Sequence, residues 1–230
     1  SFFALVDTNG FILPLTTAQD HKKIGEGDTG LNTGGMGAYS PVPFIKQNQI
    51  SDFVIKFVKP VIDDLKNNNI FFSGVFYAGL ILTKYGPKLL EINVRFGDPE
   101  VQAVLPRLKA DLLDLLLASS KGRLDQFKSL EWDNNFCINV VMASKGYPES
   151  YKKNTIISGL NKITVNTSQY IFHSSTKKNE DHWLATGGRV LSISALGSTL
   201  KEARNKAYNV INKIDWKSGY YRNDIGWKHL

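Results

Sequence analysis

The chain has little cysteine and no long apolar run, and each absence excludes a class of protein. Cys137 is the single cysteine in 230 residues, which excludes an internal disulfide framework and a multi-cysteine metal site. The longest apolar stretch, around residues 75–82, is interrupted by Gly79 and is far shorter than the roughly 18 residues of a membrane helix. The sequence opens at Ser1 without a methionine and without the basic start of a signal peptide, so we expect a fragment. These absences predict a cytoplasmic fragment without a membrane partner.

The composition that remains is that of an ordinary globular protein with a basic excess. Hydrophobic residues make up 42% of the chain and charged residues 21%, which is enough apolar material for a core. The net charge of +7 lies entirely in residues 126–230, because residues 1–125 hold equal numbers of acidic and basic side chains. The basic residues are scattered and form no arginine-rich helix or aromatic-interleaved motif. We therefore expect no nucleic-acid partner; a field that attracts phosphorylated small molecules is the milder interpretation.

Two β-hairpins are predicted in the first half of the chain. The apolar runs 1–6 and 11–15 flank Asn9-Gly10, which is a strong hairpin signal. A second pair of runs, 74–83 and 88–93, flanks a Tyr85-Gly86 turn. Because both strands of this second hairpin are mostly apolar, we expect each to be buried on at least one face.

Helices are predicted between and after these hairpins. Apolar residues recur at helical spacing over residues 50–65, and Pro60 is expected to kink that helix. A second helix is expected to begin at Asp98, with this aspartate at its cap, and to run through Leu116. Pro106 should bend it or split it.

The second half of the chain has shorter strands, predicted at residues 137–143, 170–173 and 189–195. A capping box at Thr199 then opens a final helix. The elements predict an α+β fold divided into two domains, residues 1–125 and 126–230.

Residues 19–43 are the first segment with chemical interest, since six glycines fall within residues 25–37. Gly25, Gly27 and Gly30 spell G-x-G-x-x-G, but no strand-to-helix connection surrounds them, so a dinucleotide fingerprint is rejected. A glycine-rich loop preceded by lysines lets backbone N–H groups approach an anionic ligand closely. A surface loop without a ligand is the alternative.

The second segment is the polar face of the strand that ends near residue 95. Glu91, Asn93 and Arg95 alternate along it, so they point to one face about 7 Å apart. Carboxylate and amide oxygens suit Mg²⁺, and the arginine suits a phosphate or a carboxylate. A strand whose polar face meets solvent is the alternative.

Both segments resemble one family. QDHKKIGEGDTGLNTGGMGAYSP and YAGLILTKYGPKLLEINVRFGDPEVQ are similar to the phosphoribosylamine-glycine ligase family of the ATP-grasp superfamily, and GGRVLSISALGSTLKEARNKAY with RNDIGW resembles its C-terminal domain. The resemblance implies that residues 1–125 are the second part of an ATP-grasp domain, an antiparallel sheet with helices. Residues 126–230 would form a small mixed α/β domain. The family's N-terminal half would precede Ser1 and is the implied partner.

The resemblance also implies an activity in de novo purine biosynthesis. ATP would drive the ligation of glycine to 5-phosphoribosylamine through glycyl phosphate, giving glycinamide ribonucleotide, ADP and phosphate. The chain alone is expected to bind ATP weakly and to have no measurable activity. A non-catalytic ATP-grasp-derived binding module is the alternative, and within the ligases other acid and amine substrates are the rivals. The loop DTGLNTGGMGAYSP favours the glycine ligase.

Site residues follow from the resemblance by position. Glu91 and Asn93 match ligands of Mg²⁺ or Mn²⁺, and no further acid stands at the place near Gly79 where many ATP-grasp enzymes carry one. Lys23 and Asn32 match ATP contacts, although the lysine lacks the fork of the arginine usual there. Arg95 and Asp98 are expected to face the substrates as catalytic residues. The loop closing over the reacting groups would hold Asp28, Thr29, Gly34, Gly35, Met36 and Gly37.

Overall fold

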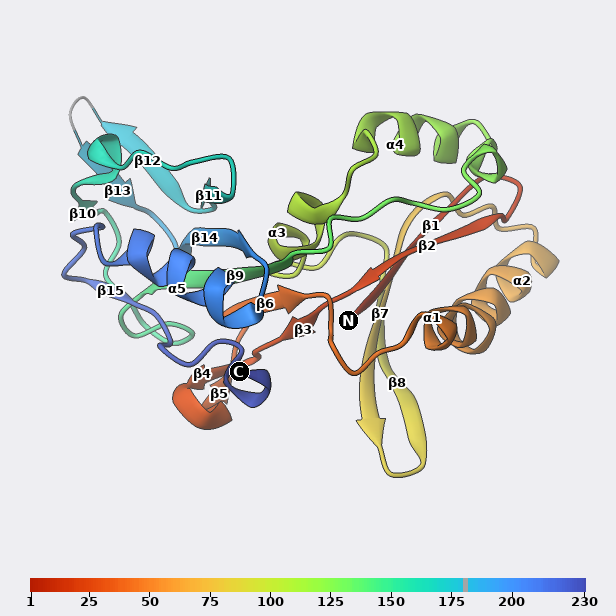
Figure 1. Ribbon diagram of the computed structural model, residues 1–230, viewed down its shortest axis with the longest axis horizontal. Helices are drawn as coiled ribbons and strands as arrows, with labels where there is room; N and C mark the ends of the chain where they lie inside the picture. Colours follow the sequence, from red (N-terminus) through yellow and green to blue (C-terminus); the bar gives the residue numbers. More distant parts are fainter. Residues whose placement is uncertain (180–181) are drawn as a thin grey trace. The chain divides into compact units, whose positions relative to one another are not determined.

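The computed structural model describes residues 1–179 and 182–230 (Figure 1). The chain forms two compact units from interleaved segments. The first unit contains Ser1–Ala18, Pro41–Gly97 and Leu108–Asp133, and the second contains Gln19–Ser40, Asp98–Arg107 and Asn134–Leu230. Antiparallel sheets with a few packed helices confirm the predicted α+β class.

The first unit is built on a four-stranded antiparallel sheet in the order β2-β1-β7-β8. Its strands are β1 (Phe2–Val6), β2 (Ile12–Thr17), β7 (Gly74–Thr83) and β8 (Gly86–Asn93). Both predicted hairpins are thereby confirmed. The core joins apolar side chains of β1 and β7 to the helical segment 47–67, including Phe2, Val6, Phe53, Phe57, Ile62 and Phe76.

The helix predicted over residues 50–65 is present with an interruption. It consists of α1 (Gln47–Phe53), a π-helical stretch (Val54–Val58) and α2 (Lys59–Asn67). Pro60 lies in the first turn of α2, directly after the π-helical stretch. The irregularity therefore falls just before the proline.

The helix predicted from Asp98 to Leu116 is split, as Pro106 led us to expect. It becomes α3 (Val101–Val104), a 3₁₀ turn (Leu105–Arg107) and α4 (Leu112–Ser120), and a short 3₁₀ turn, Leu124–Gln126, follows. The cap of α3 is Glu100, so the prediction of Asp98 as the cap was wrong. The carboxylate of Asp98 pairs instead with the guanidinium of Arg189, at 3.0 Å.

Burial of the second hairpin was predicted only in part. The inner half of β7 is buried from Val75 to Ala78, but its outer half and most of β8 are exposed. Ile81 retains 46% of its surface and Leu90 67%. The expectation that both strands bury a face was therefore wrong for β8. This strand lies at the edge of the sheet, with β7 as its one sheet neighbour in the described structure.

The second unit has a larger antiparallel sheet in the order β11-β14-β9-β6-β3, with β15 also paired to β9. Its strands are β3 (Gln19–Asp20), β6 (Gly37–Ser40), β9 (Phe136–Ser144), β11 (Gln169–His173), β14 (Arg189–Gly197) and β15 (Gly219–Tyr220). The strands predicted at 137–143, 170–173 and 189–195 are thus confirmed. Cys137 is a buried residue of β9.

Helix α5 (Leu200–Ile211) packs on β14 and β9 and completes the core of the second unit. Half of the predicted capping box is present, because the hydroxyl of Thr199 accepts the N–H of Glu202 at 3.1 Å. The carboxylate of Glu202 accepts instead the N–H and the hydroxyl of Ser198, at 2.8 and 2.6 Å. Two smaller features were not predicted as sheets. One is the sheet of β10 (Thr155–Ile157), β12 (Thr176–Asn179) and β13 (His182–Ala185), and the other is the ribbon of β4 (Lys23–Gly25) and β5 (Thr29–Asn32), with a 3₁₀ turn (Glu26–Asp28) between its strands.

No helix in residues 1–179 and 182–230 has the length and apolarity that a membrane span requires. A final 3₁₀ turn, Trp227–His229, ends the chain.

Candidate functional site

The residues predicted for the site divide between the two units. Glu91, Asn93 and Arg95 belong to the first unit, whereas the glycine-rich segment 23–37 and Asp98 belong to the second. Each set has its own local geometry.

Glu91 and Asn93 lie at the end of edge strand β8. Glu91 is paired with Gly79 of β7 and Asn93 with Tyr77, and alternation along the strand puts the two side chains on one face. No group of three or more His, Cys, Asp or Glu side chains that could hold a metal occurs in the described residues. The donor set is therefore one carboxylate and one amide oxygen. It fits a hard cation that takes its other ligands from phosphate oxygens and water.

Gly79 provides the space that the side chain of Glu91 uses. A Cβ atom at residue 79 would lie 2.7 Å from Cγ of Glu91 and 3.2 Å from its Oε1. Such a Cβ would force the carboxylate to move. Position 79, where many ATP-grasp enzymes are expected to carry an additional acid, is thus a glycine here and leaves room for the side chain of Glu91.

Arg95 lies beyond the last residue of β8, so strand alternation does not reach it. Its Nη1 donates a hydrogen bond to the carbonyl of Phe96 at 2.8 Å, and the residue is exposed. The structure therefore brings together two of the three polar residues predicted for one strand face.

The glycine-rich segment is more ordered than a loop. Its first part is the ribbon β4–β5, in which Lys23 is paired with Asn32. The two residues predicted to contact ATP are therefore direct neighbours across the ribbon. All of β5 is exposed, so this surface is open to solvent on the side of Asn32.

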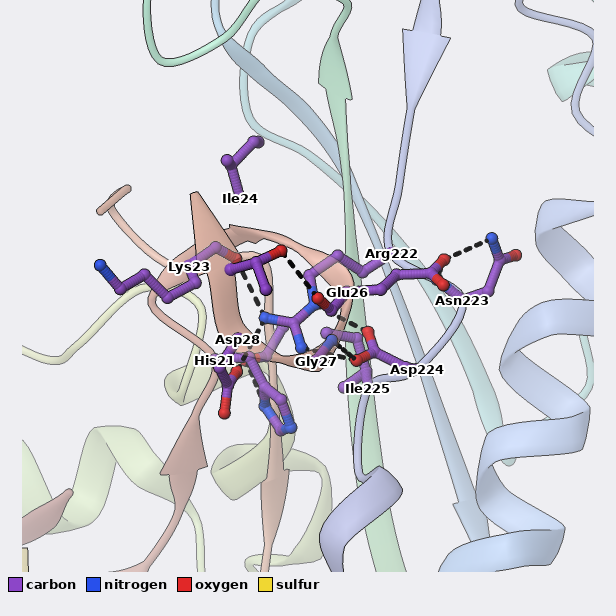
Figure 2. Close-up of polar contacts among 12 residues, drawn as sticks. His21, Lys23, Ile24, Glu26, Gly27, Asp28, Arg222, Asn223, Asp224 and Ile225 are labelled. Atoms are coloured by element: carbon purple, nitrogen blue, oxygen red, sulfur yellow. Dashed lines mark hydrogen bonds and ion pairs between the residues drawn. The ribbon is translucent and has the colours of Figure 1, made fainter. Parts of the chain in front are cut away.

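The ribbon is held at its base by Arg222, a residue that sequence reasoning did not select (Figure 2). The side chain of Arg222 is fully buried, with 0% exposed. Its Nη1 donates to the carbonyl of Lys23 and to Oδ1 of Asp28, each at 3.0 Å. Nε and Nη2 donate to the two carboxylate oxygens of Asp224 at 2.7 and 2.8 Å. The signal that could have found it is the closing RNDIGW of the family resemblance.

Asp28 and Thr29 of the predicted substrate loop are engaged within the ribbon. Burial would raise the pKa of Asp28, but hydrogen bonds from Lys228 and Arg222 outweigh it and hold this pKa below its ordinary value. The hydroxyl of Thr29 donates to the carbonyl of Glu26 at 2.9 Å. Both side chains thus stabilise the ribbon in the structure.

The turn at Gly34 and Gly35 is held by a second arginine. Nη1 of Arg189 lies 3.0 and 3.3 Å from the carbonyl oxygens of these glycines and 2.8 Å from that of Asp98. Gly35 has φ +116°, and a Cβ on it would overlap Pro99 and lie 2.7 Å from Oδ1 of Asp20. Only glycine fits this position without displacing its neighbours.

Met36 and Gly37 continue the turn into strand β6. The side chain of Met36 is fully buried in the core of the second unit. Its carbonyl accepts the N–H of Val141 at 3.0 Å. Met36 therefore fixes the end of the glycine turn, and any ligand contact there would come from the backbone.

Asp20 is a buried acid beneath this turn that sequence reasoning also missed. Its side chain is 5% exposed and pairs with Nζ of Lys22 at 3.1 Å. Burial and the nearby charge of Glu100 raise the pKa of Asp20 to about 7. No local sequence pattern indicates that this one aspartate is buried.

His21 connects three parts of the second unit. Its Nε2 accepts the N–H of Gly226 at 3.0 Å, which leaves the proton on Nδ1, 3.3 Å from the carbonyl of Gly37. Burial, at 3% exposed, and the positive charge of Arg222 lower the pKa of His21 to about 4. A neutral imidazole is therefore part of the folded structure.

His21→Gln is expected to reduce the loss of stability in acid. In the unfolded protein His21 has a pKa of 6.5 and binds a proton below that pH, whereas in the folded protein it stays neutral down to about pH 4. The free energy of unfolding therefore falls as the pH falls from about 6.5 to about 4. A shift of this size corresponds to about 3 kcal/mol. Urea unfolding of the complete protein at pH 7.5 and pH 4 should show a smaller difference for the variant. An equal difference in both proteins would contradict this role of His21.

Comparison with known proteins was made on the whole chain. The ATP-grasp (A) domain of phosphoribosylglycinamide synthetase matches residues 1–101, and the C domain of the same synthetase matches residues 137–228. Two relatives named phosphoribosylamine-glycine ligase are a protein of Rhizobium meliloti, 45% identical over 99% of this chain, and a chloroplastic protein of Arabidopsis thaliana, 47% identical over the whole chain. The chain covers 53% and 44% of their lengths, so it spans about half of the relatives it matches.

Solved structures agree with this assignment. A crystal structure of phosphoribosylamine-glycine ligase from Thermotoga maritima matches 97% of this chain with a TM-score of 0.84 at 28% identity, and the match covers 54% of that protein. A biotin carboxylase domain from Hydrogenobacter thermophilus matches with a TM-score of 0.66 at 12% identity and shares the fold alone. By its two domain matches and its relatives, the chain belongs to the phosphoribosylglycinamide synthetase family, also called the phosphoribosylamine-glycine ligases.

Proposed function

We propose that the complete protein ligates glycine to 5-phosphoribosylamine at the expense of ATP. The observation that carries this proposal is the Glu91–Asn93 pair on one face of β8 in a chain that matches both family domains. The products would be glycinamide ribonucleotide, ADP and phosphate. The role in purine synthesis follows from this reaction.

The ligand contacts are assigned within each unit separately. We assign Lys23 and Asn32, neighbours across the β4–β5 ribbon, to ATP, since a lysine ammonium and an amide suit phosphate and hydroxyl oxygens. Glu91 and Asn93 would hold a divalent cation, Mg²⁺ or Mn²⁺. That cation, when bound, would neutralise charge on the phosphates during transfer.

The acyl transfer itself would proceed in two steps. The glycine carboxylate attacks the γ-phosphorus, so that glycyl phosphate forms and ADP leaves. The amine of phosphoribosylamine then attacks the carbonyl carbon, the C–N bond forms, and phosphate leaves as the amine loses a proton. Arg95 and Asp98 are proposed to orient these substrates, and the backbone from Gly34 to Gly37 to close over them.

The expected domains and partner complete the proposal. Residues 1–125 would be the second part of the ATP-grasp domain and residues 126–230 the C domain, and the family matches at 1–101 and 137–228 support this division. The N-terminal half of the family's chain would supply the rest of the nucleotide site. A cytoplasmic location stays a prediction.

The test is ADP release from ATP with Mg²⁺, glycine and freshly generated phosphoribosylamine. We expect release by the complete protein only when all three substrates are present. This chain alone should release none, because half of a preorganised site loses most of its catalysis. Adding the N-terminal half should restore release.

The rival function is a binding module without catalysis. A folded complete protein that binds ATP but releases no ADP with both co-substrates would favour that module and overturn the ligase proposal. Release that depends on another acid and amine would instead indicate a different ATP-grasp ligase.

A further inference from the structure

We infer that two arginines of the C-domain part of the chain, Arg222 and Arg189, are positioning residues with separate tasks in the proposed reaction. Arg222 positions the ribbon that carries the proposed ATP contacts, and Arg189 positions the glycine turn together with Asp98. The inference rests on the proposed function. Neither arginine needs to touch a substrate for it to hold.

Arg222 is bound too completely to serve as a ligand contact itself. Its guanidinium is fully buried and all three nitrogens donate to groups of the protein, two of them to Asp224. A buried guanidinium is stable only when its charge and its N–H groups are satisfied. The bond to the carbonyl of Lys23 ties this charge directly to the backbone of a proposed ATP contact.

Residues next to Arg222 form further hydrogen bonds to the β4–β5 ribbon (Figure 2). Asn223 donates from its backbone and its side chain to Oε1 of Glu26, at 3.0 and 2.8 Å. Asp224 accepts the N–H of Gly27 at 2.7 Å, and the hydroxyl of Tyr220 donates to the carbonyl of Ile24 at 2.9 Å. The C-terminal segment thus binds the backbone or side chain of nearly every residue from Lys23 to Asp28.

Arg189 occupies the corresponding position at the other end of the glycine-rich segment. One nitrogen of its guanidinium serves the carbonyls of Gly34 and Gly35 and both the carbonyl and the carboxylate of Asp98. Gly34 packs against the guanidinium, since a Cβ there would lie 3.0 Å from Cζ of Arg189. The side chain of Arg189 is less buried than that of Arg222. No contact of Arg189 reaches residues 23–32 in the described structure.

The separation of the two contact sets predicts separate kinetic effects. Loss of Arg222 frees the ribbon and should weaken ATP binding, while the glycine turn keeps its own anchor. Loss of Arg189 frees the turn and Asp98 and should impair use of glycine and phosphoribosylamine, while ATP binding is kept. A purely structural role of both arginines would instead weaken everything in parallel with stability.

The experiment compares Arg222→Met and Arg189→Met in the complete protein. ATP affinity is measured by calorimetry without co-substrates, and KM for each substrate and kcat are measured by ADP release. We expect about a tenfold rise in the ATP dissociation constant for Arg222→Met, which matches the loss of about one hydrogen bond to a charged group, with KM for glycine within twofold. For Arg189→Met we expect about a tenfold loss of kcat/KM for glycine, with ATP affinity within twofold.

Three further variants control for folding. Arg107→Met removes another buried arginine of the same unit, bound to Asn135 and Ser40. It should lower the melting temperature but should not change ATP affinity and the kinetic constants for glycine by different factors. Arg222→Lys should recover part of the ATP affinity by restoring the charge without the fork. Asn223→Ala removes the side-chain hydrogen bond from this exposed residue to Glu26. We expect a smaller rise in the ATP dissociation constant, and this variant tests the inference if Arg222→Met does not fold.

Two outcomes would overturn the inference. One is a parallel change of ATP affinity and glycine kinetics in both arginine variants that follows their melting temperatures. The other is the absence of any change in a folded variant. If the unaltered protein showed no turnover, the proposed function would fail, but the calorimetric comparison of Arg222→Met, Asn223→Ala and Arg107→Met would still decide whether Arg222 positions a nucleotide site.

Discussion

Glu91→Gln is expected to lower kcat/KM of the complete protein by about 10²–10³, the usual effect of removing one preorganised electrostatic contact at a reacting phosphate. The substitution keeps the length of the side chain and its fit against Gly79, so the change is confined to charge. Asn93→Ala should act in the same direction, because it removes the second oxygen of the pair. ADP release measured over a range of Mg²⁺ concentrations gives both effects.

The matched control is Asp63→Asn in the same unit. Asp63 is an exposed acid that pairs with Lys59 on α2, and its neutralisation should leave kcat/KM and the Mg²⁺ dependence unchanged. A higher Mg²⁺ concentration should recover part of the activity of Glu91→Gln. Unchanged activity and Mg²⁺ dependence in this variant would remove Glu91 from the proposed metal site.

Gly35→Ala is expected to destabilise the second unit and to abolish activity under conditions in which the unaltered protein is folded. The new Cβ would overlap Pro99 and press on Oδ1 of Asp20, at a backbone conformation that L residues rarely adopt. Together these costs correspond to about 2–4 kcal/mol. Urea unfolding and ADP release of the complete protein measure the two effects.

Gly27→Ala separates steric overlap from backbone preference. Gly27 also has a positive φ, +64°, but no atom lies within 4 Å of the Cβ it would gain. We expect a loss of only about 1 kcal/mol, the lower end of the usual cost of a left-handed conformation for an L residue. Equal losses for Gly27→Ala and Gly35→Ala would show that crowding under the glycine turn is not important.

The parts of the fold that were predicted correctly are those with local signals. Asn9-Gly10 is a turn signal that requires no distant partner, and the N-cap bond of Thr199 lies within one helical turn. The cap of α3 was wrong because Asp98 has a better partner, Arg189, far along the sequence. Burial of β8 was wrong because composition alone does not show which strand lies at the edge of the sheet.

The candidate site also has features with a local sequence signal and features without one. The shared face of Glu91 and Asn93 follows from strand alternation, and their placement confirms that geometry. The pairing of Lys23 with Asn32 was not foreseen, because the segment was expected to be a loop. Arg222 and Arg189 were missed because a single basic residue has no periodicity, and the carbonyls of Lys23 and Gly34 that they bind lie 199 and 155 residues away.

The hold of Arg222 on the ribbon also determines when this region can form during protein synthesis. Residues 23–32 leave the ribosome well before the residue that anchors them, because Arg222 follows Lys23 by 199 residues. Strand β6 likewise cannot form its sheet pairing before β9 is translated, since Ser40 is paired with Cys137. Such distant pairings form late and slowly. Translation that stops before Arg222 therefore yields a chain whose glycine-rich segment has no anchor at the end proposed to bind ATP.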